Sequence, residues 1–370
     1  MLVISIIILI AYLTLLLRFS TAIYYNDSTE SISYAPNISI IIAARNEEKN
    51  IPLLIESLLK QNYPINKYEI IIVNDRSIDN TKSLIESYQL DNNNIYLINI
   101  EKTPLGWGNK KWALTKAIES SQSDIILQTD ADCIPNADWI QTMTSYFKNP
   151  NIGFVCGPSP LIHSDFLLNN LFQMESLIQE AVNAGAIKNK LVLSCTGRNI
   201  AFRKKEFNSV DGYIGNENIL SGDDDLLLQK FALKTDKLIE YSISPKSLVE
   251  SPAPTNFNFF LKQRLRFASK GLFYYQNQTT LELKYILILL FLTNCIFIWS
   301  MGNLFMIGSL LYLVPILIKL LADLLLSAVF IGQLKREWSL LSYLILTTIH
   351  PFYVVIIGGL GPLIKVNWKR

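Results

Sequence analysis

The stretch Asp124-Ile125-Ile126-Leu127-Gln128-Thr129-Asp130-Ala131-Asp132 decides the fold class of this chain. Its apolar residues 125–127 are typical of a buried strand, and two aspartates follow with one small residue between them. Side chains alternate along a strand, so Asp130 and Asp132 are expected to point to the same side. In open α/β sheets, ligands bind at the carboxyl ends of the strands. Because Asp-x-Asp also occurs in solvated turns, the rest of the chain has to decide between a turn and a binding site.

Two carboxylates at a strand end suit a hard divalent cation, Mg²⁺ or Mn²⁺, that is shared with a phosphate group. The chain has 2 histidines, His163 and His350, and they are far apart in the sequence. A histidine-rich zinc site is therefore disfavoured.

The composition divides the chain into apolar ends and a middle of ordinary globular composition. Of the 370 residues, 50% are hydrophobic and 17% are charged, whereas about a quarter charged is usual for a soluble protein. The net charge of +2 gives no sign of nucleic-acid binding, so no nucleic-acid partner is expected. The 4 cysteines form no Cys-x-x-Cys pair, which favours reduced thiols and a cytoplasmic domain.

The apolar ends predict an integral membrane protein. Residues 1–18 lack a basic start and end on Arg18, which favours a retained transmembrane anchor with the following domain in the cytoplasm. Residues 284–362 predict three or four membrane helices, and the division between 304 and 334 is left open. The bilayer is thus an expected partner.

Basic residues near the C-terminal helices give conflicting topology signals. Lys335 and Arg336 favour a cytoplasmic loop, and Lys365, Lys369 and Arg370 favour a cytoplasmic C-terminus. With three C-terminal spans, the loop at 335–336 and the C-terminus cannot both lie in the cytoplasm.

The region 36–275 is predicted to be one α/β domain. Strand patterns at 37–44, 68–73, 95–100 and 125–128 alternate with helical patterns near 51–59, 81–88 and 110–120. This alternation indicates a mostly parallel sheet with helices on both faces, and right-handed crossovers bring the loops after Ala44, Val73 and Gln128 to one edge. No glycine-rich phosphate loop follows the first strand, which disfavours dehydrogenases and P-loop enzymes.

A second acidic cluster, Asp223-Asp224-Asp225, precedes an apolar helical pattern at 226–233. Adjacent aspartates repel one another unless they cap a helix or meet a cation. Capping of that helix by Asp223 or Asp224 is the structural alternative. A helix cap needs only one aspartate, so the negative charge of the other two aspartates needs a further explanation.

A basic and aromatic segment, 259–270, allows two interpretations. Such a helix often lies at a membrane surface. Alternatively, Arg264 or Arg266 faces a diphosphate, for which a planar bidentate donor is apt. The sequence leaves both open.

Six segments in this order carry a resemblance to a known family: Ile40–Glu47, Val73–Asp79, Asn109–Leu114, Asp130–Asp132, Ser221–Asp224 and Gln263–Phe267. Together they resemble the membrane-anchored branch of glycosyltransferase family 2, inverting enzymes with the GT-A fold such as cellulose synthase, hyaluronan synthase and ceramide glucosyltransferase. The likeness covers residues 36–272. Asn109 replaces the family's glycine, and Phe267 replaces a tryptophan that lines the acceptor site.

The resemblance implies a role for each matched position. Asp224 would be the catalytic base, and Asp132 with Asp130 would hold the metal. Donor binding is implied for Ala43, Arg45, Glu47, Asp75, Lys110, Asp130, Gln263, Arg264 and Arg266. The acceptor side is implied for Gly197, Arg198, Asp223 and Phe267.

The implied activity is transfer of a sugar from a nucleotide-diphosphate sugar, foremost a UDP-sugar, to a hydroxyl of a lipid-linked or glycan acceptor, with inversion at the anomeric carbon. The expected location is the bacterial inner membrane. Two alternatives stay open. One is a membrane module that binds a nucleotide without catalysis, and the other is a nucleotidyltransferase, which would release pyrophosphate.

Overall fold

The computed structural model describes residues 1–370 except 26–33, 163–166, 220, 270–273, 276–278 and 361–370. The chain forms two compact units, which are taken one at a time. The sheet unit comprises Asp27–Pro160 and Ser194–Pro252. The helical unit comprises Met1–Asn26, Leu161–Leu193 and Ala253–Arg370.

The sheet unit is built on a 7-stranded sheet of order β3-β2-β1-β4-β7-β6-β8. β1, β2, β3 and β4 are parallel, β7 is antiparallel to both β4 and β6, and β6 is parallel to β8. The predicted mostly parallel sheet is therefore confirmed. The strand bounds are β1 Ile38–Ala44, β2 Tyr68–Asp75, β3 Ile95–Ile100, β4 Ile125–Gln128, β6 Ile152–Cys156, β7 Ile200–Arg203 and β8 Leu238–Tyr241. A second sheet pairs β5 Ile134–Pro135 with β9 Val249–Glu250.

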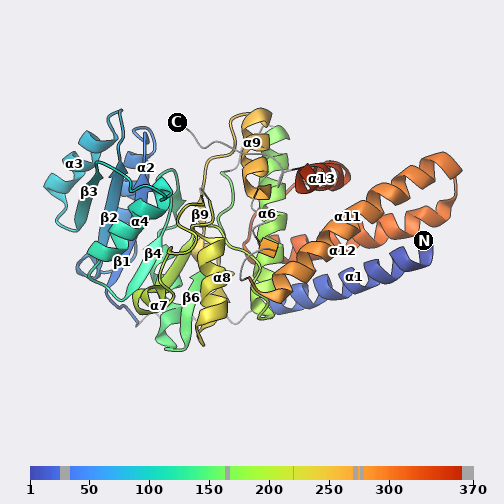
Figure 1. Ribbon diagram of the computed structural model, residues 1–370, viewed down its shortest axis with the longest axis horizontal. Helices are drawn as coiled ribbons and strands as arrows, with labels where there is room; N and C mark the ends of the chain where they lie inside the picture. Colours follow the sequence, from blue (N-terminus) through green and yellow to red (C-terminus); the bar gives the residue numbers. More distant parts are fainter. Residues whose placement is uncertain (26–33, 163–166, 220, 270–273, 276–278, 361–370) are drawn as a thin grey trace. The chain divides into compact units, whose positions relative to one another are not determined.

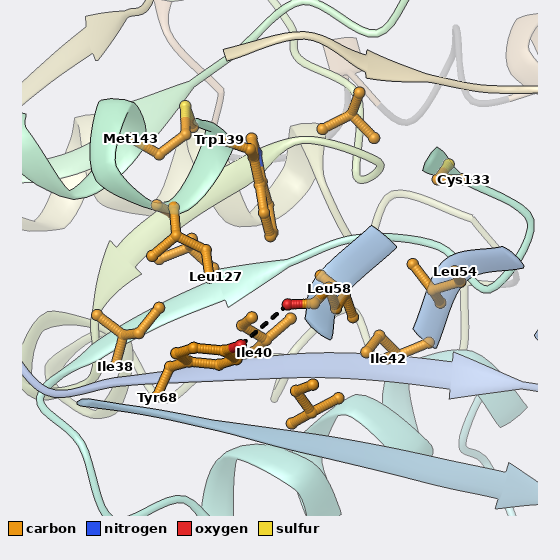
Figure 2. Close-up of a cluster of buried hydrophobic side chains, with 14 of the residues drawn as sticks. Ile38, Ile40, Ile42, Leu54, Leu58, Tyr68, Leu127, Cys133, Trp139 and Met143 are labelled. Atoms are coloured by element: carbon orange, nitrogen blue, oxygen red, sulfur yellow. Dashed lines mark hydrogen bonds between the residues drawn. The ribbon is translucent and has the colours of Figure 1, made fainter. Parts of the chain in front are cut away.

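Helices cover this sheet and complete its core. They are α2 Ile51–Leu59, α3 Thr81–Asp91, α4 Asn109–Ser120, α5 Trp139–Ser145, α7 Lys204–Ser209 and α8 Asp225–Lys234. Figure 2 shows Ile40 and Ile42 of β1 with Leu54 and Leu58 of α2, all buried. In the same view the Tyr68 hydroxyl donates to the carbonyl oxygen of Leu58 at 3.1 Å. Burying such side chains contributes about 1.5–3 kcal/mol each, so the apolar runs in the sequence fix the strands at the centre.

The helical unit contains α1 Leu2–Tyr24, α6 Leu167–Lys188, α9 Phe257–Ala268, α11 Leu281–Ile307, α12 Leu313–Gln333 and α13 Leu340–Leu360. Within the described residues, 4 helices are long and apolar enough to cross a membrane: Leu2–Tyr24, Leu281–Ile307, Leu310–Gln333 and Leu340–Leu360. The C-terminal region therefore has three such helices. In Figure 1, α1, α11 and α12 run lengthwise, whereas α13 is seen end-on. Lys365, Lys369 and Arg370 lie outside the described residues, so their side of the membrane stays a prediction.

The division that the sequence left open falls at Gly308. Its φ of 72° is left-handed, which ends α11, and its N–H donates to the carbonyl oxygen of Leu304 at 3.0 Å. The apolar stretch 304–318 is thus split between two helices. Glycine adopts this backbone conformation at little cost, which makes it the usual residue just beyond a helix.

Polar side chains are buried inside the helical unit. The Lys319 ammonium lies 2.7 Å from the Asp323 carboxylate, an i,i+4 pair on one face of α12. The Tyr12 hydroxyl of α1 donates to the other oxygen of Asp323. A charged pair with a third partner ties α12 to α1 where both helices are otherwise apolar.

Candidate active site

The carboxyl ends of β1, β2 and β4 lie next to one another in the sheet, as right-handed crossovers between parallel strands require. The loops that leave them carry Arg45 and Glu47 after β1, Asp75 and Arg76 at the end of β2, and Asp130 after β4. Ala43 is the neighbour of Val73 in the β1–β2 register, one residue before the end of β1. The predicted convergence of these loops is therefore present.

Asp75 is held by two arginines at this edge. Its carboxylate is buried, lies 3.8 Å from Nη1 of Arg45 and accepts from Nε of Arg76 at 2.8 Å. Arg76 has a left-handed φ of 56°, which turns the chain back sharply after β2. The pairing fixes the direction of the Asp75 carboxylate.

The loops after β1 and β2 are joined by side-chain hydrogen bonds to backbone groups. The N–H of Asn46 donates to Ser77 Oγ at 3.0 Å, and the Asn46 side chain accepts from the N–H of Ile78 at 2.9 Å. The N–H of Glu47 donates to Thr81 Oγ1 at 2.8 Å, and the Glu47 carboxylate accepts from the Asn50 side chain at 2.7 Å. Glu47 thus helps to shape the loop before α2.

Lys110 joins two acidic loops. It lies in the first turn of α4, and its ammonium is 2.8 Å from Asp130 Oδ1 and 2.8 Å from Asp223 Oδ2. Burial alone would lower the pKa of Lys110, but Asp130 and Asp223 outweigh it and hold that pKa well above its ordinary value. Burial would likewise raise the pKa of Asp223, but Lys110 outweighs it and lowers that pKa. Both groups are therefore charged at neutral pH.

Asp132 follows Asp130 in the chain, with Ala131 between them. Burial raises the pKa of its carboxyl, the charge of Asp130 raises it further, and Arg198 acts in the opposite direction. The Cys133 thiol lies 3.6 Å from Asp132 Oδ1, and burial together with this carboxylate raises the pKa of that thiol. The buried Asp132 carboxyl beside the charge of Asp130 is therefore a place where added positive charge is favourable.

The donor set fits a hard cation that takes its remaining ligands from a substrate. Asp130 and Asp132 offer oxygen ligands, as Mg²⁺ and Mn²⁺ prefer. Within the described ranges, no group of three or more His, Cys, Asp or Glu side chains is arranged to hold a metal ion. A Mg²⁺ site of one or two carboxylates plus substrate phosphates needs no such group.

The pairing of β7 with β4 brings Gly197 close to Gln128, and Asp224 is hydrogen-bonded to Gly197. Because β7 runs antiparallel to β4, its first residue, Ile200, lies opposite Gln128, and the preceding loop lies beside the residues after β4. The Gln128 side chain donates to the carbonyl oxygen of Gly197 at 3.1 Å, and the N–H of Gly197 donates to Asp224 Oδ2 at 2.9 Å. A Cβ on Gly197 would stand 3.1 Å from Asp223 Oδ2, so this position has little room for a side chain.

Asp224 is also the N-cap residue of α8. Its Oδ1 accepts from the N–H of Asp225 at 2.8 Å. The capping alternative is therefore observed, and it coexists with the contact to Gly197. Two backbone N–H donors orient the carboxylate and stabilise its negative charge.

Arg198 and Asn199 stabilise the loop before β7. Arg198 donates through Nε to Thr196 Oγ1 at 2.9 Å and through Nη1 to Ser251 Oγ. The Asn199 amide donates to the carbonyl oxygens of Pro158 and Ser247, each at 2.8 Å, and is fully buried. Asn199 is thus a structural support, while the charge of Arg198 acts to lower the pKa of Asp132.

The remaining predicted positions belong to the helical unit. Gln263, Arg264, Arg266 and Phe267 all lie on α9. The Arg264 guanidinium forms an ion pair with Glu175 of α6. The roles given to these residues stay predictions.

Sequence reasoning missed several partners within the sheet unit. The family resemblance implies no role for Arg76, which pairs with the adjacent Asp75. The Lys111 ammonium donates to the carbonyl oxygen of Asn216 at 2.6 Å, which anchors α4 to the segment before the acidic cluster. Tyr213 is buried, and its burial and the charge of Asp223 raise its pKa. The sequence displays directly that Arg76 adjoins Asp75 and that Lys111 adjoins Lys110, whereas the burial of Tyr213 beside Asp223 has no such signal.

Known proteins share this architecture. The structure of a mannosyltransferase from Pyrobaculum calidifontis in complex with GDP-Man and Mn²⁺ matches with a TM-score of 0.59 at 16% identity and covers 98% of each chain. At this identity the likeness shows the fold, and it confirms the predicted GT-A class. Residues 39–210 match the model of glycosyl transferase family 2. The match identifies this part of the chain as a glycosyl transferase family 2 domain.

Curated relatives agree with this family. The chain is 25% identical over 242 residues to "Probable glycosyltransferase YdaM" of Bacillus subtilis, which covers 65% of this chain and 56% of that protein. It is 27% identical over 243 residues to a poly-beta-1,6-N-acetyl-D-glucosamine synthase of Staphylococcus epidermidis, which covers 63% and 54%. A beta-monoglucosyldiacylglycerol synthase of Synechocystis is 30% identical over 118 residues, 32% of this chain and 24% of that one. The chain spans about half the length of the first two relatives.

Proposed function

We propose that this protein is a membrane-bound inverting glycosyltransferase. It moves a sugar from a nucleotide-diphosphate sugar, foremost a UDP-sugar, to a hydroxyl of a lipid-linked or glycan acceptor. The observation that carries the proposal is the cluster around Lys110. There Asp130, from the loop after β4, comes together with Asp223 and Asp224, from the segment before α8, at the carboxyl edge of the sheet.

Asp224 is assigned the role of general base. It takes the proton of the acceptor hydroxyl while that oxygen attacks the anomeric carbon. The new C–O bond forms as the bond to the diphosphate breaks, and the nucleoside diphosphate leaves with the electron pair. One displacement inverts the anomeric configuration. A positioned carboxylate of this kind contributes about 10²- to 10⁴-fold to the rate.

The other side chains orient the donor. Asp75, fixed by Arg45 and Arg76, is placed to accept hydrogen bonds from a nucleobase. Lys110 supplies a positive charge beside Asp130 that a diphosphate can share. Asp130 and Asp132 would hold Mg²⁺ or Mn²⁺, which when bound stabilises the charge of the leaving diphosphate. These assignments follow the family resemblance and are consistent with the geometry of the sheet unit.

Contacts within the helical unit support the proposed membrane orientation. The Gln333 side chain donates to the carbonyl oxygen of Tyr24 at 3.4 Å, so the C-terminal ends of α1 and α12 are adjacent. Arg18 lies near the first end, and Lys335 and Arg336 follow the second. By the positive-inside tendency, this shared end faces the cytoplasm of a bacterial inner membrane. An apolar acceptor can then be delivered from the bilayer, and transfer of a single sugar to a lipid is the favoured case.

The test is release of nucleoside diphosphate from a panel of nucleotide sugars by membranes that contain the protein, with Mg²⁺ or Mn²⁺ present. We expect release with at least one donor and its dependence on an added glycolipid or glycan fraction. Pyrophosphate release would support a nucleotidyltransferase instead. Donor binding without any product would support a binding module.

A further inference from the structure

Gln128 is a fully buried polar residue at the end of β4. Its neighbours in the register of the sheet are apolar, Ile41 of β1 and Ile200 of β7. Burying an amide is costly unless its polar atoms are hydrogen-bonded. In the part of the chain that the structure describes, Gln128 Oε1 has no hydrogen-bond partner. An apolar side chain of the same length would fill this place without that cost.

The nitrogen of the Gln128 amide is hydrogen-bonded to the loop before β7. Nε2 donates to the carbonyl oxygen of Gly197 at 3.1 Å, and it would stand 3.1 Å from a Cβ on Gly197. The amide therefore lies directly against the backbone of a residue that has no side chain. Because the backbone of glycine is freer than that of other residues, its conformation is fixed here by contacts from outside.

Gly197 in turn holds Asp224. The N–H of Gly197 donates to Asp224 Oδ2 at 2.9 Å. The N–H and the carbonyl group of one residue belong to the two peptide planes that meet at its Cα. The hydrogen bond from Gln128 holds one of these planes, and the other carries the N–H that contacts Asp224. Two hydrogen bonds thus connect Gln128 to Asp224, and all three residues belong to the sheet unit.

We propose that Gln128 is a positioning residue for Asp224. It fixes the backbone of Gly197, and this backbone sets the direction in which the Asp224 carboxylate points. The inference rests on the proposed function, which makes Asp224 the base. Natural sequences break the rules of burial mainly at functional sites, where stability is given up for activity. Gln128 therefore contributes to turnover and little to the stability of the fold.

The test is Gln128→Met in the full chain, because methionine keeps the length of the side chain and removes the amide. The carbonyl oxygen of Gly197 loses this donor, but the unpartnered Oε1 is removed as well, so the two effects on stability oppose each other. We expect an unfolding midpoint within about 3 °C of wild type. Turnover should fall about 5- to 20-fold, since a misplacement of about 1 Å can cost about 10²-fold. The donor KM should stay within about twofold of wild type, because donor binding does not use this contact.

Gln61→Met is the matched control, because Gln61 is a second buried glutamine of the sheet unit. Its Nε2 donates to the carbonyl oxygen of Asn136 at 2.8 Å, and its Oε1 accepts from the N–H of Ile140 at 3.0 Å. Both polar atoms of this amide are paired, so the variant should lower the unfolding midpoint by about 4–8 °C. Its kcat for nucleoside diphosphate release should equal that of the wild type below the midpoint.

Stability and turnover together separate positioning from a structural role. If Gln128→Met does not fold, or loses more of its midpoint than expected, the amide stabilises the fold and the inference is overturned. A stable variant with a smaller fall in kcat, or with a change confined to the donor KM, overturns it as well. Each of these results leaves the proposed function standing, because the wild type still transfers sugar. A wild type that releases no nucleoside diphosphate overturns the proposed function, and this inference with it.

Discussion

Replacement of Lys110 by methionine tests the electrostatics of the site in depth. The change removes the ammonium that lies 2.8 Å from both Asp130 and Asp223. Breaking a buried ion pair by removing one partner costs about 3–5 kcal/mol, and an exposed pair is worth about 0–1 kcal/mol. The Asp223 side chain is 10% exposed, whereas those of Asp130 and Lys110 are 29% and 34% exposed. We therefore expect a loss of about 2–4 kcal/mol at pH 7, most of it from Asp223.

The stability difference between Lys110→Met and wild type should change with pH in one direction. In the wild type the pKa of Asp223 is lowered, so its contribution to stability is present above the unfolded pKa of about 3.9 and is lost as the pH falls through the folded pKa. In Lys110→Met, burial without the ammonium raises the pKa of Asp223. The variant then regains stability as it takes up a proton, so the difference from wild type should narrow as the pH falls toward 4.

The assay is thermal unfolding of purified protein in detergent between pH 4 and 8. A loss of this size lowers the midpoint by about 5–10 °C at pH 7 for a domain of this length. Lys116→Met is the control, because it removes an exposed pair with Glu119 on the same helix and should shift the midpoint by little. Equal midpoints for Lys110→Met and wild type at pH 7, or a gap that widens on acidification, would refute the reasoning.

Three further predictions address other parts of the chain. Gly197→Ala should lower turnover about 3- to 10-fold with little change in the unfolding midpoint, because the new Cβ would stand 3.1 Å from Asp223 Oδ2 and must shift that side chain, which is next to Asp224 in the chain. Full turnover in steady-state assays would contradict this. Asp323→Leu should destabilise the helical unit by about 3–5 kcal/mol in thermal unfolding, since it leaves Lys319 buried and unpaired. The stability of the double variant, Lys319→Met with Asp323→Leu, should lie nearer that of the wild type. A double variant that is less stable than Asp323→Leu would count against this account. Chelation with EDTA should abolish nucleoside diphosphate release and added Mn²⁺ or Mg²⁺ should restore it; activity that persists in EDTA would exclude a required divalent cation.

The loops after β1, β2 and β4 could be located from the sequence alone. Each follows a short apolar run, and right-handed crossovers leave one edge for the polar residues beyond Ala44, Val73 and Gln128. The strand bounds of β3 and β4 coincide with the apolar patterns because those runs are bounded by polar residues on both sides. The fold class could therefore be predicted, because the local apolar patterns and their order along the chain indicate the same parallel sheet.

The partners within the site were not readable, because they depend on long-range pairing. Gly197 meets Asp224 only because β7 pairs antiparallel with β4, and no local pattern signals that direction. The ion pair between Arg264 and Glu175 joins residues 89 positions apart. Gly308, by contrast, carried a local signal for the end of α11, since glycine commonly follows the last residue of a helix.

The most direct test of the central claim is Asp224→Asn, measured for donor binding and for turnover in parallel. The asparagine keeps the shape of the side chain and can still accept a hydrogen bond from the N–H of Gly197 or Asp225, but it cannot take the acceptor proton. We predict that donor affinity stays within about threefold of wild type while turnover falls about 10²- to 10⁴-fold. Turnover close to wild type would contradict the assignment of Asp224 as the base and the mechanism built on it.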